Sequence, residues 1–154
     1  MYPAGKYCLT IVTLSAVSAA CSENAYLVHV RARGKGVFEE SLVKTLDSEV
    51  VANGFASLGS GERNPGSPGS TVSSFSKQMS ADFRDRVEIY LIWEREPPEG
   101  PSVKIDILDV GRWNEPNRRT ELDEMGTRFE QILTKASGTD HITVERKPIS
   151  RFIF

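Results

Sequence analysis

Cysteine and histidine are scarce in this chain of 154 residues. The cysteines are Cys8 and Cys21, and the histidines are His29 and His141. So few thiols exclude a domain that several disulfides hold together. No cysteine or paired carboxylate stands at metal-ligand spacing beside either histidine. The sequence therefore predicts neither a zinc site nor another metal centre.

Charge of one sign and nucleotide-binding motifs are also lacking. The formal net charge is −2, which favours neither nucleic acid nor an anionic surface as a partner. No Lys-Ser/Thr pair follows the glycines of residues 59–69, as a phosphate-binding loop requires. No Gly-x-Ser-x-Gly sequence offers a catalytic serine. We predict a protein that binds no cofactor and no nucleic acid and is not an enzyme.

Long hydrophobic runs are missing except near the amino terminus. Lys6 and the terminal amine supply positive charge, and a mostly apolar stretch from Tyr7 to Val17 follows. Even when extended to Ala20, this stretch is shorter than the roughly 20 residues that a helix needs to span a bilayer. A positive start, an apolar segment and small residues at the end are typical of a secretory signal peptide. The sequence predicts that residues 1–20 are removed on export.

The end of this segment reads Val17-Ser18-Ala19-Ala20-Cys21 and resembles the lipobox of bacterial lipoproteins. The resemblance covers residues 1–22 and implies that Cys21 is acylated and becomes the first residue of the mature chain. The serine after the cysteine, Ser22, resembles the pattern of lipoproteins that are sent to the outer membrane. The resemblance implies that this protein is anchored at the periplasmic face of that membrane. Ser18 stands where the family prefers leucine. Cleavage by the general signal peptidase is the alternative, and its product would be soluble in the periplasm or secreted.

Cys21 is also the one cysteine left once residues 1–20 are removed. A lone thiol in an oxidising compartment cannot form an internal disulfide, and acylation explains its presence. Each buried methylene of an acyl chain contributes ~0.8 kcal/mol, so two or more chains anchor a protein stably. We predict a lipid tether over residues 21–25, followed by a single α+β domain over residues 26–154.

The domain alternates between the periods of strands and helices. Apolar residues at every second position predict strands over residues 26–33, 71–79 (weakly), 86–94, 102–110 and 141–146. Apolar residues three or four apart predict helices over residues 37–53 and from Thr120 to Gly138. The second helix is expected to begin at Thr120 because Arg118 and Arg119 would oppose the helix dipole in a first turn.

Residues 56–74 interrupt this pattern because they are rich in glycine, serine and proline. We expect a flexible loop there, either functional or an idle insertion. The order of the other elements predicts an α+β two-layer sandwich. Its antiparallel or mixed sheet would carry two helices on one face, in a ferredoxin-like or related arrangement.

The sheet face away from the predicted core carries apolar residues that suit a partner surface. Alternation places Tyr90, Ile92 and Leu108 on that face. A sheet that is partly apolar on both faces is either covered by the same chain or contacts a partner. The cover would be the C-terminal residues 149–154, and a partner is the alternative.

His29, Arg31, Arg33 and Lys35 form a positive stripe along the first strand, and Arg31 and Arg33 are candidates for the partner surface. One interpretation pairs them with Glu88, Glu94 and Glu145 on neighbouring strands. The other gives them an acidic partner or lipid headgroups. RNA is not expected, because no aromatic-rich signature accompanies the stripe.

Two hypotheses on function follow from the export signal and the absence of catalytic motifs. The first is a small envelope lipoprotein that serves as a binding or assembly accessory module for an unidentified envelope protein. The second is an inhibitor or immunity-type lipoprotein that neutralises a toxin or hydrolase through the loop at residues 56–74.

Overall fold

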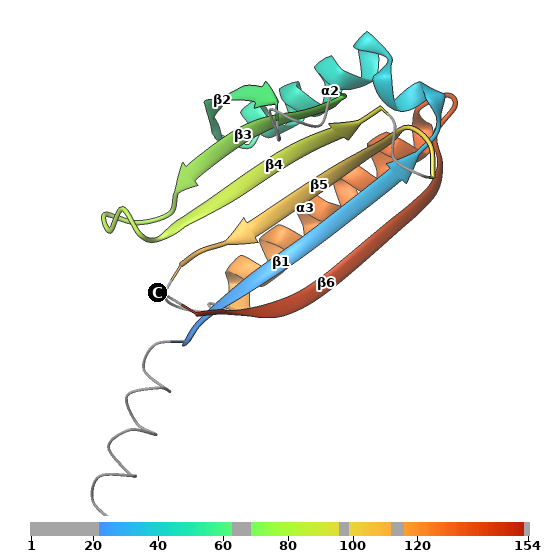
Figure 1. Cartoon of the computed structure of the whole chain (residues 1–154). Coiled ribbons are helices and arrows are strands. Elements are labelled where there is room, and N and C mark those ends of the chain that lie inside the picture. Colours follow the sequence, from blue (N-terminus) through green and yellow to red (C-terminus); the bar gives the residue numbers. More distant parts are fainter. Residues whose placement is uncertain (1–21, 63–68, 96–98, 112–115, 153–154) are drawn as a thin grey trace, which may run out of the picture.

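The computed structural model describes residues 22–62, 69–95, 99–111 and 116–152, so the predicted signal peptide and Cys21 lie outside the described residues. Within those ranges the elements follow one another as β1 (Ser22–Arg33), η1 (Lys35–Phe38), α2 (Glu40–Ala52), β2 (Ala56–Glu62), β3 (Ser70–Gln78), β4 (Arg86–Glu94), β5 (Ser102–Asp109), α3 (Pro116–Lys135) and β6 (Asp140–Phe152) (Figure 1). The element η1 is a 3₁₀-helix. None of the helices described is long and apolar enough to cross a membrane.

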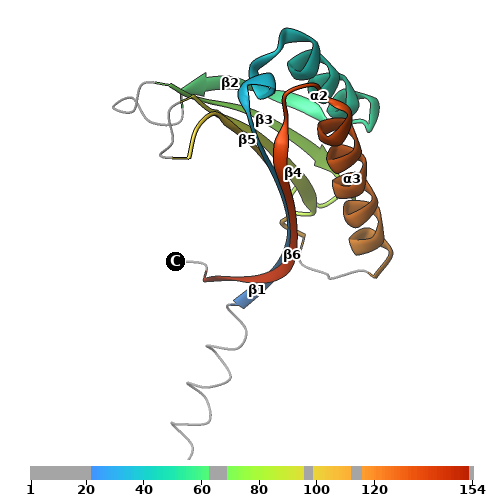
Figure 2. The ribbon, with the colours of Figure 1, turned by 90° about the vertical axis from the view of Figure 1, so that its right-hand side faces the viewer.

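The six strands form one sheet in the order β2-β3-β4-β5-β1-β6, and every neighbouring pair is antiparallel. Both helices cover the same face of the sheet (Figure 2). The strands β6-β1-β5-β4 and the two helices have the order of a ferredoxin-like βαββαβ sandwich, and the β2-β3 hairpin extends the sheet beyond β4. The predicted α+β two-layer sandwich is confirmed, with a sheet that is antiparallel rather than mixed.

The prediction of a flexible loop over residues 56–74 is wrong for the part that the structure describes. Residues 56–62 form β2 and residues 70–74 belong to β3, and the two strands pair with a bulge between Ser57 and Gly59. Few side chains here are apolar. The segment is ordered because β3 bonds along the edge of β4 and Phe75 is buried at 5% exposure.

The predicted tether over residues 21–25 is wrong from residue 22 onward. Strand β1 begins at Ser22, and its first residues pair with the end of β6, Ser22 opposite Phe152 and Ala25 opposite Ile149. The sequence pattern had ended the last strand at Arg146, which left residues 22–25 without a partner. Because β6 continues to Phe152, these residues form a strand instead.

The second helix begins at Pro116, four residues before the predicted Thr120. Arg118 lies in the first turn, where a free cation would be unfavourable. It is instead only 8% exposed and paired with the carboxylates of Asp85 and Asp109. The two carboxylates offset the unfavourable interaction of Arg118 with the helix dipole, which was a reason for predicting the later start.

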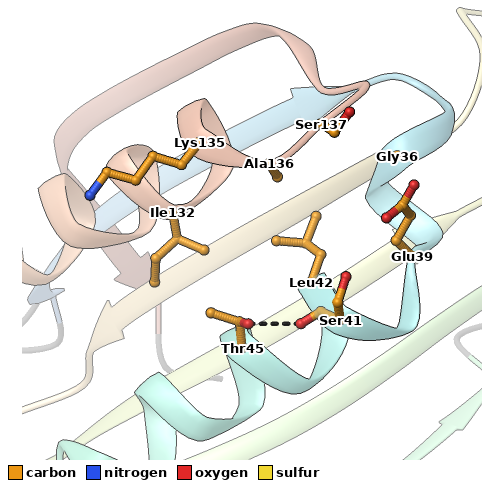
Figure 3. A pocket seen from close by; sticks show the side chains of 9 residues that line it. All are labelled: Gly36, Glu39, Ser41, Leu42, Thr45, Ile132, Lys135, Ala136 and Ser137. Atoms are coloured by element: carbon orange, nitrogen blue, oxygen red, sulfur yellow. Dashed lines mark hydrogen bonds between the residues drawn. The ribbon is translucent and has the colours of Figure 1, made fainter.

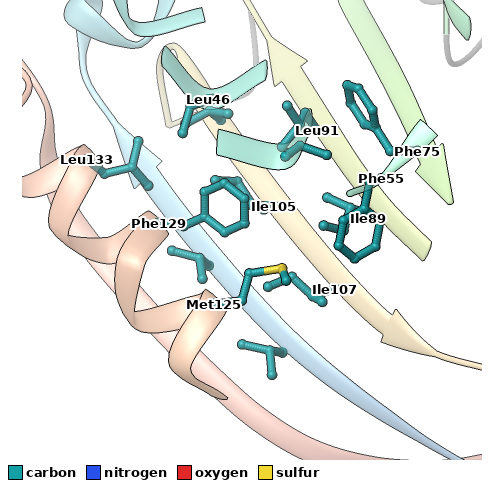
Figure 4. Packing of buried hydrophobic residues seen from close by; sticks show 14 of the residues in the cluster. Leu46, Phe55, Phe75, Ile89, Leu91, Ile105, Ile107, Met125, Phe129 and Leu133 are labelled. Atoms are coloured by element: carbon teal, nitrogen blue, oxygen red, sulfur yellow. The ribbon is translucent and has the colours of Figure 1, made fainter. Parts of the chain in front are cut away.

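The core lies between the helices and the covered face of the sheet (Figure 4). Phe129 of α3 and Leu46 of α2 are fully buried there, against strand residues such as Ile105. Gly126 of α3 allows the helix to approach β1 closely, since a Cβ at residue 126 would lie 2.5 Å from Cγ1 of Val28.

Candidate binding face of the sheet

The face of the sheet opposite the helices is not covered by any helix among the described residues. The sheet curves so that this open face is concave (Figure 2). Residues that oppose one another on neighbouring strands share a face. Three rows therefore cross the open face: Lys147-Leu27-Leu108-Glu88-Ser76, Glu145-His29-Asp106-Tyr90-Ser74 and Thr143-Arg31-Lys104-Ile92-Val72. We call this surface the open face.

The arginine stripe of the open face is neutralised by a residue that lies outside the strands. Glu99, which precedes β5, accepts from Arg31 Nη2 at 3.2 Å and is also ion-paired with Arg33. The predicted partners Glu88 and Glu94 bind other groups. The Nε atom of Arg31 is buried without a hydrogen-bond partner among the described residues.

The other charged groups of the open face are paired as well. Lys104 Nζ lies 2.8 Å from Glu94 Oε2. His29 Nδ1 bonds to the carboxylate of Asp106 on the neighbouring strand. Glu145, the third predicted partner, lies 3.4 Å from Nζ of Lys147 on its own strand. The open face is therefore a network of both signs rather than a positive patch.

The three apolar candidates lie on the open face as predicted but offer little accessible surface. Ile92 is 4% exposed and Leu108 is 7% exposed. Tyr90 is half-buried and donates its hydroxyl to Glu88 Oε2 at 2.6 Å. A partner on the open face would therefore meet mainly the charged and polar side chains.

Leu108 is covered by a small apolar cluster that includes part of the C-terminal segment. The cluster consists of Ala25, Leu108 and Val110, with Leu27 and Ile149 packed against it. The expectation that residues 149–154 cover the open face holds for Ile149, which does so as part of strand β6. Ile153 and Phe154 lie outside the described residues.

A buried ion cluster connects the start of α3 with the ends of two strands. Arg118 Nη1 donates to Asp85 Oδ1 at 2.5 Å and lies 3.5 Å from Asp109 Oδ1. Asp109 Oδ1 also accepts from the Gly111 amide at 2.8 Å. A Cβ on Gly111 would lie 2.5 Å from Arg118 Nη1 and 2.6 Å from Asp85 Oδ1, so a larger residue there would have to displace these side chains. These contacts fix the end of β5 against α3.

The pKa values of the two acids of this cluster are shifted in opposite directions. The hydrogen bond from Arg118 lowers the pKa of Asp85. Burial raises the pKa of Asp109, against the opposing effects of the Gly111 amide and Arg118. Ionised Asp85 therefore stabilises the folded chain at neutral pH, and its contribution is lost as the pH falls toward its lowered pKa. For Asp109 the effect of pH on stability is opposite, because its raised pKa means that protonation of the carboxylate favours the folded state.

A hollow of about 270 Å³ lies between the start of α2 and the end of α3 (Figure 3). The side chains facing it include Glu39, Leu42, Thr45 and Lys135. Thr45 Oγ1 donates to the backbone oxygen of Ser41 at 2.7 Å. No histidine lines the hollow, so it does not bring together the histidine and carboxylate that an acid–base site would need.

The two histidines do not converge. His29 opposes Glu145 on β6, four residues along that strand from His141, which corresponds to about 13 Å at ~3.3 Å per residue. Within the described ranges no group of three or more histidine, cysteine or acidic residues could hold a metal ion.

Neither family models nor curated proteins show a match to this chain. Its function is therefore inferred from its own residues.

Proposed function

We propose that this protein is a lipid-anchored accessory module of the bacterial cell envelope that binds another envelope protein through the open face. The observation that carries the binding role is the concave sheet face, which no described helix covers. The export segment and the lipobox-like sequence ending at Cys21 support the location.

The charged network suits a surface that exchanges its contacts for those of a partner. The side chains of Arg31 and Arg33 are 24% and 30% exposed, and that of Glu99 is 52% exposed. Ion pairs with this degree of exposure contribute about 0–1 kcal/mol to stability. A partner's polar groups can therefore replace Glu99 at little cost to the fold, while the pattern of signs selects the partner.

Inhibition of a toxin or hydrolase stays the alternative function. It was linked to a long flexible loop at residues 56–74, and the described part of that segment is the β2-β3 hairpin. An inhibitor would thus have to act through this hairpin or through the open face. The identity of a captured partner separates the two functions.

Photo-cross-linking in cells tests the open face directly. A photoreactive amino acid at Ser74 or Thr143 samples the open face without disturbing an ion pair named above. Ser48 on α2 and Gln131 on α3 are exposed control positions on the helix layer. We expect one partner to be cross-linked from both open-face positions and from neither control position.

Cross-links of equal yield from the helix positions, or none from the open face, would contradict the binding role. An envelope-assembly protein as the partner supports the accessory function. A toxin or hydrolase supports the inhibitor instead.

A further inference from the structure

We propose that the end of the sheet where β1 begins lies against the bilayer, and that Phe83 and Arg84 contact the lipid there. This inference rests on the proposed acylation of Cys21. It adds to the anchor a protein surface that fixes how the domain stands on the membrane.

Phe83 is an exposed aromatic residue in the turn between β3 and β4. Its exposure of 68% compares with 66% for Leu58 and 57% for Val51, the other large hydrophobic residues that are exposed within the described part of the chain. The guanidinium of Arg84 lies 5.4 Å from the centre of the Phe83 ring. An aromatic ring beside a cation suits the headgroup region, where rings are enriched and arginine binds phosphate.

The register places this turn at the same end of the sheet as the start of β1. Asp109 of β5 opposes both Tyr26 of β1 and Val87 of β4, so β1 and β4 run in the same direction. Strand β1 begins at Ser22 and β4 begins at Arg86, so the β3-β4 turn that holds Phe83 lies before the start of β4 at this same end. Figure 1 shows the β3-β4 turn and the start of β1 at one end of the molecule.

The anchor leaves little room between this end and the membrane. Cys21 is joined directly to Ser22, which is already paired with Phe152 in the sheet. Consecutive Cα atoms are 3.8 Å apart, so acyl chains on Cys21 would bring the first pair of the β1-β6 ladder to the headgroups. A long tether would have allowed the domain to stand clear of the lipid.

The end of strand β6 lies beside the start of β1. The backbone of Phe152 is opposite Ser22. The β3-β4 turn that holds Phe83 is separated from this edge by strand β5, which lies between β4 and β1 in the sheet. Contacts at two separated positions would prevent the domain from rotating freely about Cys21.

Depth-dependent quenching tests the proposed contact. The acylated protein carrying Phe83→Cys has its free thiol at residue 83, where a fluorophore is attached before reconstitution into phosphatidylethanolamine–phosphatidylglycerol vesicles. Leu58→Cys is the matched control for an exposed apolar side chain, and Ser137→Cys labels the opposite end of the sheet. We expect headgroup-level spin-labelled lipid to quench position 83 several-fold more strongly than positions 58 and 137.

Equal quenching at all three positions would overturn the membrane contact. The mass of the N-terminal peptide is measured on the same samples, so the two proposals fail separately. An unmodified Cys21 means that the proposed anchor is wrong. An acylated Cys21 with an unquenched label at residue 83 means that only the contact is wrong.

Discussion

Replacement of Cys21 by alanine is expected to transfer most of the protein from the membrane fraction to the soluble periplasmic fraction, or to stall removal of residues 1–20. The physical reason is the loss of the acyl chains. Each methylene contributes ~0.8 kcal/mol, whereas a contact such as that of Phe83 buries one side chain and anchors weakly by comparison. Fractionation of cells followed by immunoblotting measures the distribution and the size of the protein.

Ser22→Ala is the matched control, since it alters the neighbouring residue and retains the cysteine. The control variant should stay in the membrane fraction at the mature size. If Cys21→Ala also stays membrane-bound at the mature size, the lipid anchor is wrong. The alternative of a soluble or secreted product predicts instead that the wild-type protein itself is found in the soluble fraction.

Arg118→Met is expected to cause a large loss of stability of the folded domain. The variant leaves the carboxylates of Asp85 and Asp109 without their buried cation. Breaking a buried ion pair from one side costs about 3–5 kcal/mol, which lowers the melting temperature of a domain of this size by about 10 °C. Thermal unfolding followed by circular dichroism measures the change.

Arg128→Met provides the control for loss of an arginine from the same helix. Its side chain is 51% exposed, and Nη1 lies 3.8 Å from Glu49 Oε1. Exposed pairs contribute about 0–1 kcal/mol, so the melting temperature should change little. Similar losses in Arg118→Met and Arg128→Met would contradict a stabilising role for the buried cluster.

Acid unfolding gives a second measurement on the same pair of variants. The pKa of Asp85 is lowered by its bond to Arg118, so the wild-type protein loses this contribution as the pH falls below the ordinary aspartate pKa of about 3.9. In Arg118→Met that loss should disappear, because Asp85 no longer has the cation that favours its charge. Arg128→Met should retain it.

The elements with strong apolar periodicity could be predicted from the sequence. The strand expected over residues 86–94 coincides with β4. In α2, the apolar stripe of Leu42, Leu46 and Val50 is buried in the core of the domain. These segments carry their own pattern because each buries one regular set of side chains. The two-layer sandwich followed from their order.

The elements that depend on a neighbouring strand could not be predicted in the same way. Strand β2 has few apolar residues, and its order comes from pairing with β3. Residues 22–25 form a strand because β6 reaches Phe152. Both errors arose because backbone pairing with another strand leaves no periodic signal in the sequence of either strand.

The open face was predicted only in part. Alternation placed Tyr90, Ile92 and Leu108 on the correct face, but how far neighbouring side chains cover them depends on the packing of the whole sheet. The pairing of Arg31 and Arg33 with Glu99 connects β1 to the turn before β5. The exposure of Phe83 was likewise hidden, because its turn shows no pattern of burial.

The most direct test of the lipid-anchored module is the mass of the N-terminal peptide of the protein isolated from membranes. Residues 1–20 are predicted to be absent, and Cys21 is predicted to be the first residue and to carry acyl chains. An N-terminal peptide that retains residues 1–20, or that begins at an unmodified Cys21, would contradict the account.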